Sequence, residues 1–232
     1  MAPAAQNDRR AIVDRLLRGQ AYRELGAARL FEGGRALAPT AALEAVIDGH
    51  ATEERAHYRA VIDVWAAFAG ESAAVMEARA ERRLRERPLP AVSSWFELGM
   101  AQFLFDRAGL WQLREYADCS FQPYRALTAA ILGDERAHQD FGADAVVAGC
   151  RAGEPQADAT FARWLAVALL SFGRPDSDGD RAAVTAGLKR RPAAAVMRDF
   201  LDDIRPTAVE ARLRMPSPAT LGLTLPVDLP FG

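Results

Sequence analysis

The sequence predicts an all-α protein. Apolar residues recur at helical spacing from about Asp8 to Arg205, and no segment keeps the two-residue alternation of a half-buried strand. Glycine, proline and serine divide this region into segments that are long enough for helices. The chain has 232 residues, of which 50% are hydrophobic, and this suffices for one sizeable core. We therefore expect one helical domain over residues 1–205 and a proline-rich tail over residues 206–232.

Two long helices are expected at the start of the chain. The first runs from about Asp8 to Gly33, where glycine supplies a left-handed cap. The second begins after Thr40, which suits an N-cap, and continues to Gly70. The short connection makes the two an antiparallel hairpin. A charge-rich helix over residues 71–87 then precedes a break at Pro88–Pro90.

The second half of the chain repeats this plan. A helix over about residues 95–118, a turn near Pro123 and a helix that ends near Gly153 form a second hairpin, so that four long helices make a bundle. Further helices are expected over residues 156–172, 180–190 and 193–204, and the tail is expected to wrap the surface or meet a partner. The acidic run from Asp176 to Asp180 lacks the glycine and glutamate of a calcium loop, and we expect a turn and helix N-cap there.

Composition argues against several classes of protein. The net charge of -2 and the pI near 6.0 do not favour nucleic-acid binding. Cys119 and Cys150 are too few for a disulfide framework, and no stretch has the length and apolarity of a signal peptide or membrane span. We expect a cytoplasmic protein without a nucleic-acid or membrane partner. No fingerprint for a bound flavin or NAD occurs.

The strongest functional signal is a duplicated tetrapeptide, Glu-Arg-Ala-His, at Glu54–His57 and Glu135–His138. Chance placement of 14 Glu and 3 His would give about 0.2 Glu-x-x-His pairs, so two identical copies point to a shared function. Residues three apart share a helix face, so each copy aims a carboxylate and an imidazole at the same place. Such pairs on facing helices hold two iron or manganese ions in bundle proteins.

Hairpin geometry selects two further carboxylates. Residues at equal distances from a connecting turn lie at the same height in a helical hairpin. Measured from the turn near Pro123, Asp106 lies level with Glu135, whereas Glu97 lies too far away and Glu115 too near.

In the first hairpin the same measure favours Glu24 and rejects Glu32, which abuts the turn. The predicted ligands then recur 81 or 82 residues apart in the two halves. Their apolar neighbours at helical spacing place the carboxylates in the core, where cations must compensate their charge. The predicted metal ligands are Glu24, Glu54, His57, Asp106, Glu135 and His138.

Three polar residues near these ligands have two readings each. His50, one turn before Glu54, is either a support for the ligands or an ordinary core histidine. Glu53 and Asp134 either accept a hydrogen bond from a ligand histidine across the bundle, which would fix its tautomer, or are exposed helix charges.

Several stretches between Leu17 and Met215 match a known family. They are Tyr22-Arg23-Glu24, Phe31 to Gly33, Ala38 to Thr40, both Glu-Arg-Ala-His copies, Ser94-Trp95, Asp106, Pro123 to Ala126, and Phe172-Gly173. In these residues the sequence resembles the catalytic subunit of bacterial phenylacetyl-CoA epoxidase, in the phenylacetate-catabolism branch of the ferritin-like superfamily. The resemblance implies a ferritin-like four-helix bundle with additional C-terminal helices, and it assigns the same six metal ligands.

The resemblance also implies a di-iron monooxygenase that uses O2 to epoxidise or hydroxylate an aromatic or apolar substrate, such as an acyl-CoA thioester. Glu54 and Glu135 are the expected bridging, catalytic ligands, Glu24 and Asp106 the terminal ones. Two iron ions are expected, with manganese as the alternative metal. An external reductase must supply electrons, and a homodimer or a hetero-oligomer with a related structural subunit is expected. The alternatives are a ferritin-like iron-binding protein or ferroxidase, and a structural subunit of a multicomponent oxygenase.

Overall fold

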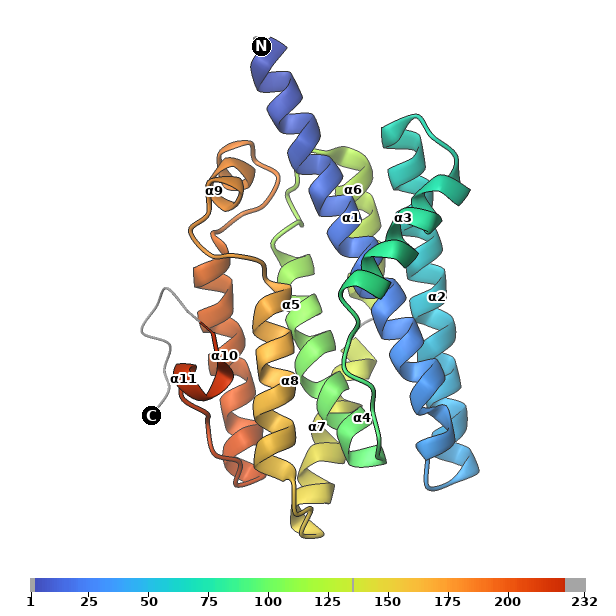
Figure 1. The fold of residues 1–232 in the computed structure, drawn as a ribbon, viewed down its shortest axis with the longest axis vertical. Coiled ribbons are helices and arrows are strands. Elements are labelled where there is room, and N and C mark those ends of the chain that lie inside the picture. Colours follow the sequence, from blue (N-terminus) through green and yellow to red (C-terminus); the bar gives the residue numbers. More distant parts are fainter. Residues whose placement is uncertain (1–2, 135, 224–232) are drawn as a thin grey trace.

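The computed structural model describes residues 3–134 and 136–223, and these residues form helices joined by turns and loops, with no strand among them. Helices α1 (Pro3–Gly34) and α2 (Ala41–Ala69) form the expected antiparallel pair, joined by a short 3-10 turn, η1 (Arg35–Leu37) (Figure 1). Thr40 caps α2 by accepting a hydrogen bond from the Leu43 amide at 3.2 Å, and Gly70 ends it with φ 72°. The all-α fold class is therefore confirmed.

The second pair is built from shorter pieces. Helix α4 (Trp95–Ala101) passes through a π-helical turn, η2 (Gln102–Asp106), into α5 (Arg107–Arg114), and α6 (Gln122–Asp134) and α7 (Arg136–Arg151) flank residue 135. The predicted extension to Asp118 is wrong. The chain leaves the helix at Glu115, whose carbonyl accepts a hydrogen bond from the Arg190 amide at 3.0 Å.

The remaining helices surround this bundle. Helix α3 (Ala73–Glu86) crosses α1 and α2, whereas α8 (Ala157–Ser171) and α10 (Ala193–Glu210) pack beside η2 and α5 on the other side (Figure 1). Helix α9 (Asp178–Thr185) begins at the predicted N-cap, because Ser177 Oγ accepts from the Asp180 amide. The prediction that α9 reaches residue 190 is wrong, since the chain turns through Gly187 with φ 64°.

The described residues of the C-terminal region, 206–223, are partly helical. Helix α10 continues through Pro206 to Glu210, although proline removes one backbone donor. Burial of Ala208 and Leu213 favours this continuation. Helix α11 (Pro218–Leu221) follows and packs on α8, so residues 206–223 lie against the helical body, and residues 224–232 of the predicted tail lie outside the described residues.

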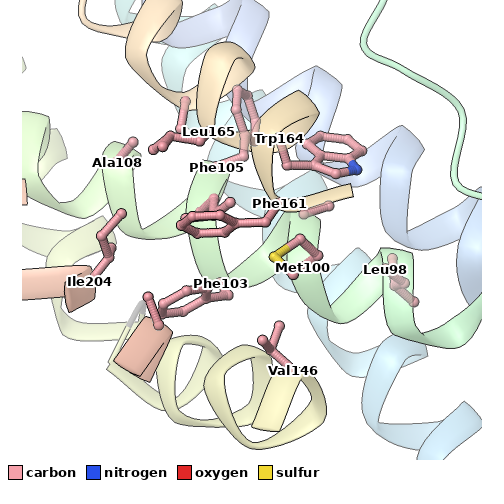
Figure 2. Close-up of a cluster of buried hydrophobic side chains, with 14 of the residues drawn as sticks. Leu98, Met100, Phe103, Phe105, Ala108, Val146, Phe161, Trp164, Leu165 and Ile204 are labelled. Carbon is pink, nitrogen blue, oxygen red and sulfur yellow. The ribbon is translucent and has the colours of Figure 1, made fainter. Parts of the chain in front are cut away.

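Buried apolar side chains of the described residues form two clusters. The first joins α4, η2 and α5 to α7, α8 and α10, and Figure 2 shows Phe103, Phe161 and Trp164 at its centre. The second joins α1, α2, α6 and α9 around residues such as Leu17 and Trp65. Along α2, the motif residues lie between the first cluster and the second.

Glycines allow α4 and η2 to approach α7 closely. A Cβ on Gly142 would lie 2.6 Å from the Phe103 amide nitrogen, and a Cβ on Gly99 would lie 2.6 Å from the Ala145 Cβ. Real side chains do not tolerate such distances, so this backbone contact requires glycine. The contact holds the π-helical turn, and with it Asp106, against the helix that carries His138.

No helix in the described ranges is long and apolar enough to cross a membrane.

Candidate metal centre

Five of the six predicted ligands converge in the interior of the bundle. Glu24 comes from α1, Glu54 and His57 from α2, Asp106 from the end of η2, and His138 from α7, and each is at most 7% exposed. The sixth, Glu135, lies outside the described residues. Charged side chains are rarely buried together without compensation, so this convergence is itself a sign of a site.

The five side chains form two triads that share one carboxylate. Potential ligand atoms of Glu24, Glu54 and His57 lie within 4.8 Å of one another, as do those of Glu54, Asp106 and His138. His57 Nδ1 lies 4.0 Å from Glu54 Oε2, and His138 Nδ1 lies 3.6 Å from Glu54 Oε1. The two imidazoles therefore face opposite oxygens of Glu54, which is the arrangement that a bridging carboxylate needs.

The orientation of His138 is fixed from α2. Its Nε2 lies 2.7 Å from Glu53 Oε2, so the carboxylate accepts a hydrogen bond from the Nε2–H group. In the neutral ring Nδ1 is then the unprotonated nitrogen, and Nδ1 is the atom that faces Glu54. The predicted contact between Glu53 and His138 across the bundle is thus present, whereas the side chain of Asp134 lies outside the described part of the chain.

His50 lies against the ring of His138, with 4.0 Å between ring centroids. His50 Nδ1 lies 3.0 Å from the side-chain nitrogen Nε2 of Gln102, which is the first residue of η2. Burial, and then the neighbouring His138, lower the pKa of His50 to about 4, so the ring is neutral at pH 7. His50 therefore packs against the predicted ligand His138 and does not belong to either triad.

Glu24 is held by a hydrogen-bonded group that sequence reasoning missed. Gln20 Nε2 donates to Glu24 Oε1, while Gln20 Oε1 accepts from Arg23 Nη2 and, at 3.0 Å, from the Tyr124 hydroxyl. Burial raises the pKa of Tyr124 well above its usual range, so the hydroxyl stays protonated and donates. The available signal was Gln20 itself, a polar residue one turn before Glu24 on the same apolar face.

These residues fit a pair of divalent cations. Burial, and then the negative charge of the neighbouring Glu24, raise the pKa of Asp106 well above its usual value. Asp106 Oδ2 is buried and accepts no hydrogen bond from any described residue. Cations would satisfy this oxygen and offset the charge, and a donor set of carboxylate and imidazole suits iron or manganese.

The carboxylates that the sequence rejected as ligands have other roles. Glu97 is buried and accepts hydrogen bonds from Ser93 and Trp164. Glu115 pairs with Arg191 at 2.7 Å, and Glu32 forms a two-point ion pair with Arg55 at 2.6 and 2.7 Å. These three carboxylates take part in contacts between neighbouring segments. Distance from the connecting turn therefore distinguished them correctly from the carboxylates that converge in the bundle interior.

Two cavities meet near the triads. A small one of about 20 Å³ is lined by Glu24, Glu54 and Asp106. A larger one of about 500 Å³ opens between α1, the segment after α3, and the end of α8. Three side chains line both: Gln20, Arg23 and Phe105.

The larger pocket is amphipathic. Leu16, Phe105 and Val167 contribute apolar surface, and the described residues that line it include four arginines and no carboxylate. Its volume is within the range of small-molecule sites in proteins.

A search of the curated proteins finds no match to this chain. The family model described as "Phenylacetic acid catabolic protein" matches residues 39–223, which include Glu54, His57, Asp106 and His138. The match covers well over half of the sequence and spans three of the four bundle segments. The chain therefore belongs to the phenylacetic acid catabolic protein family.

Proposed function

We propose that this protein is a di-iron monooxygenase that inserts one oxygen atom of O2 into an aromatic or apolar substrate of phenylacetate catabolism. The observation that carries the proposal is the pair of buried triads sharing Glu54. When bound, two iron ions activate O2 and supply the oxygen atom to be transferred. The balance requires two electrons and two protons from outside, and the second oxygen atom leaves as water.

Each described ligand has a distinct role in this proposal. Glu54 would be shared by the two ions, Glu24 and His57 would hold one, and Asp106 and His138 would hold the other. Glu135, the second Glu of the repeat, is proposed as the other bridge. Glu53 and Gln20 contact His138 and Glu24 and would hold these two side chains in place.

The 500 Å³ pocket is the proposed substrate site, because it shares three lining residues with the small cavity beside the carboxylates and has partly apolar walls. Arg15 and Arg87 are exposed at this pocket and Arg83 is half-buried. Three arginines without an acidic neighbour in the lining favour a substrate with an anionic portion, such as an acyl-CoA thioester. An iron-storage protein has no need of such a pocket.

The proposal includes partners. The described residues contain no flavin or dinucleotide motif, so an external reductase is expected to supply the electrons. Assembly as a homodimer or with a related structural subunit is proposed with it.

A single-turnover experiment tests the function. The protein is loaded anaerobically with Fe²⁺, analysed for metal, reduced with dithionite, and mixed with phenylacetyl-CoA and ¹⁸O₂. Mass spectrometry should find one ¹⁸O atom in the product. Glu54→Ala should abolish incorporation, whereas Glu32→Ala, a matched change at a carboxylate outside both triads, should retain it.

The two alternatives give different outcomes. Iron uptake beyond two ions per chain with no labelled product would indicate iron storage. Iron-free protein that supports labelling only in a complex with another subunit would indicate a structural role.

A further inference from the structure

Two polar side chains and one phenylalanine line both cavities and form the wall between them. Gln20 is 2% exposed and Arg23 is 9% exposed, and both line the large pocket and the small cavity. Phe105 completes the shared lining. A substrate in the large pocket can reach the carboxylates only if some of these side chains move.

Gln20 is the centre of this wall. Its amide donates to Glu24 on one side and accepts from Arg23 and Tyr124 on the other. Rotation of Gln20 toward the pocket would break all three hydrogen bonds together. The position of Glu24 is therefore coupled to the closed arrangement of the wall.

Arg23 gives opening a driving force. Its Nη1 is buried and donates no hydrogen bond to any described residue. An unsatisfied guanidinium donor in the interior is costly, and an acceptor oxygen on an entering molecule would satisfy it. A ligand that binds the open arrangement better than the closed one shifts the population toward it.

We propose that Gln20 and Arg23 form a gate between the substrate pocket and the metal centre, and that Gln20 is a positioning residue that releases Glu24 when the gate opens. The inference rests on the proposed function, since the gate controls access to the ions.

Azide binding to the oxidised, iron-loaded protein measures passage through the gate directly. Azide is small enough to enter the site, and stopped-flow absorbance follows its binding without turnover. Gln20→Ala removes the centre of the wall. Tyr124→Phe removes one bond to Gln20, keeps the ring, and is the conservative variant if Gln20→Ala folds poorly.

Gln122→Ala is the matched control. Gln122 is exposed on α6, is not among the lining residues of either cavity, and its side-chain oxygen accepts a hydrogen bond from Arg125. A gate predicts azide binding about tenfold faster or more in Gln20→Ala, because Gln20 makes three hydrogen bonds and the loss of one alone accounts for a factor of about this size. Tyr124→Phe should show a smaller increase and Gln122→Ala the native rate.

Equal azide rates in Gln20→Ala, Tyr124→Phe and the control, with full metal content, would overturn the gate and leave the proposed function intact. Absence of bound iron in the native protein and all variants would instead overturn the proposed function, and the gate with it. Elemental analysis before each measurement separates the two failures.

Discussion

Glu53 and His138 are joined by a contact of 2.7 Å between helices α2 and α7, although 85 positions separate them in the sequence. Glu53 is half exposed, whereas His138 is almost fully buried. A surface carboxylate thus reaches inward to hold an imidazole whose other nitrogen faces the shared carboxylate Glu54. The residue that precedes the first tetrapeptide therefore serves the second one.

Glu53→Ala should weaken metal binding at the position formed by Asp106 and His138. Loss of the acceptor frees the ring to change tautomer, and comparable losses in other proteins lower metal affinity by about 10- to 100-fold. Titration with Mn²⁺ or Fe²⁺ monitored by calorimetry checks this. Asp63→Ala, an exposed carboxylate on the same helix, should bind metal as the native protein does.

Glu54→Ala and Glu24→Ala should differ in metal stoichiometry. Glu54 belongs to both triads, whereas Glu24 belongs to one. We expect Glu54→Ala to lose both ions and Glu24→Ala to lose mainly the ion held with His57. Elemental analysis after gel filtration measures the ratio, and identical ratios in the two variants would contradict the shared position of Glu54.

Metal-free protein should lose stability as the pH rises, because of Asp106. Burial raises its pKa above the usual value of 3.8, so the folded state holds the proton more tightly than the unfolded state does. The contribution of Asp106 to the free energy of unfolding is fully present below pH 3.8, the usual pKa. It is lost as the pH rises through the raised pKa of the folded state. Urea unfolding of chelator-treated protein at several pH values should show this decline relative to Asp106→Asn. A difference in unfolding free energy between the two proteins that stays constant with pH would contradict this prediction.

Gly142→Ala should destabilise the protein by about 1–3 kcal/mol, because the added methyl group would meet the backbone at Phe103. Gly49→Ala is the control. Gly49 is exposed in the middle of α2 with nothing within 4 Å of an added Cβ, so alanine there should stabilise the helix by up to about 1 kcal/mol. Chemical denaturation of both variants tests the pair, and equal effects would contradict the close contact.

Much of the bundle could be predicted from local sequence. Thr40 and Gly70 bound α2 because capping depends on neighbouring residues only. The ends of α5 and α10 were misjudged because distant contacts decide them: Glu115 bonds to Arg190, and Ala208 packs in the core beyond Pro206. Local propensity does not contain either contact.

In the candidate site, too, the features set by regular geometry could be predicted and those set by distant contacts could not. The positions of Glu24 and Asp106 beside the two tetrapeptides could be predicted from helical spacing and from distance to the connecting turn. Both rules follow from regular helix geometry. The π-helical turn before Asp106 was not predicted, since nothing in its sequence distinguishes it from an α-helix. Gln20 and Tyr124 were missed because their contact joins α1 to α6 across 104 positions.

The buried carboxylates lie between the two hydrophobic clusters, so their charge affects how the clusters are held together. On α2, Ala51 packs in one cluster and Tyr58 in the other, with Glu54 and His57 between them. Repulsion among carboxylates at this junction would loosen one end of the bundle from the other, and cations would fasten the ends together. Metal occupancy would then set whether the two ends of the bundle unfold as one cooperative unit or in separate steps.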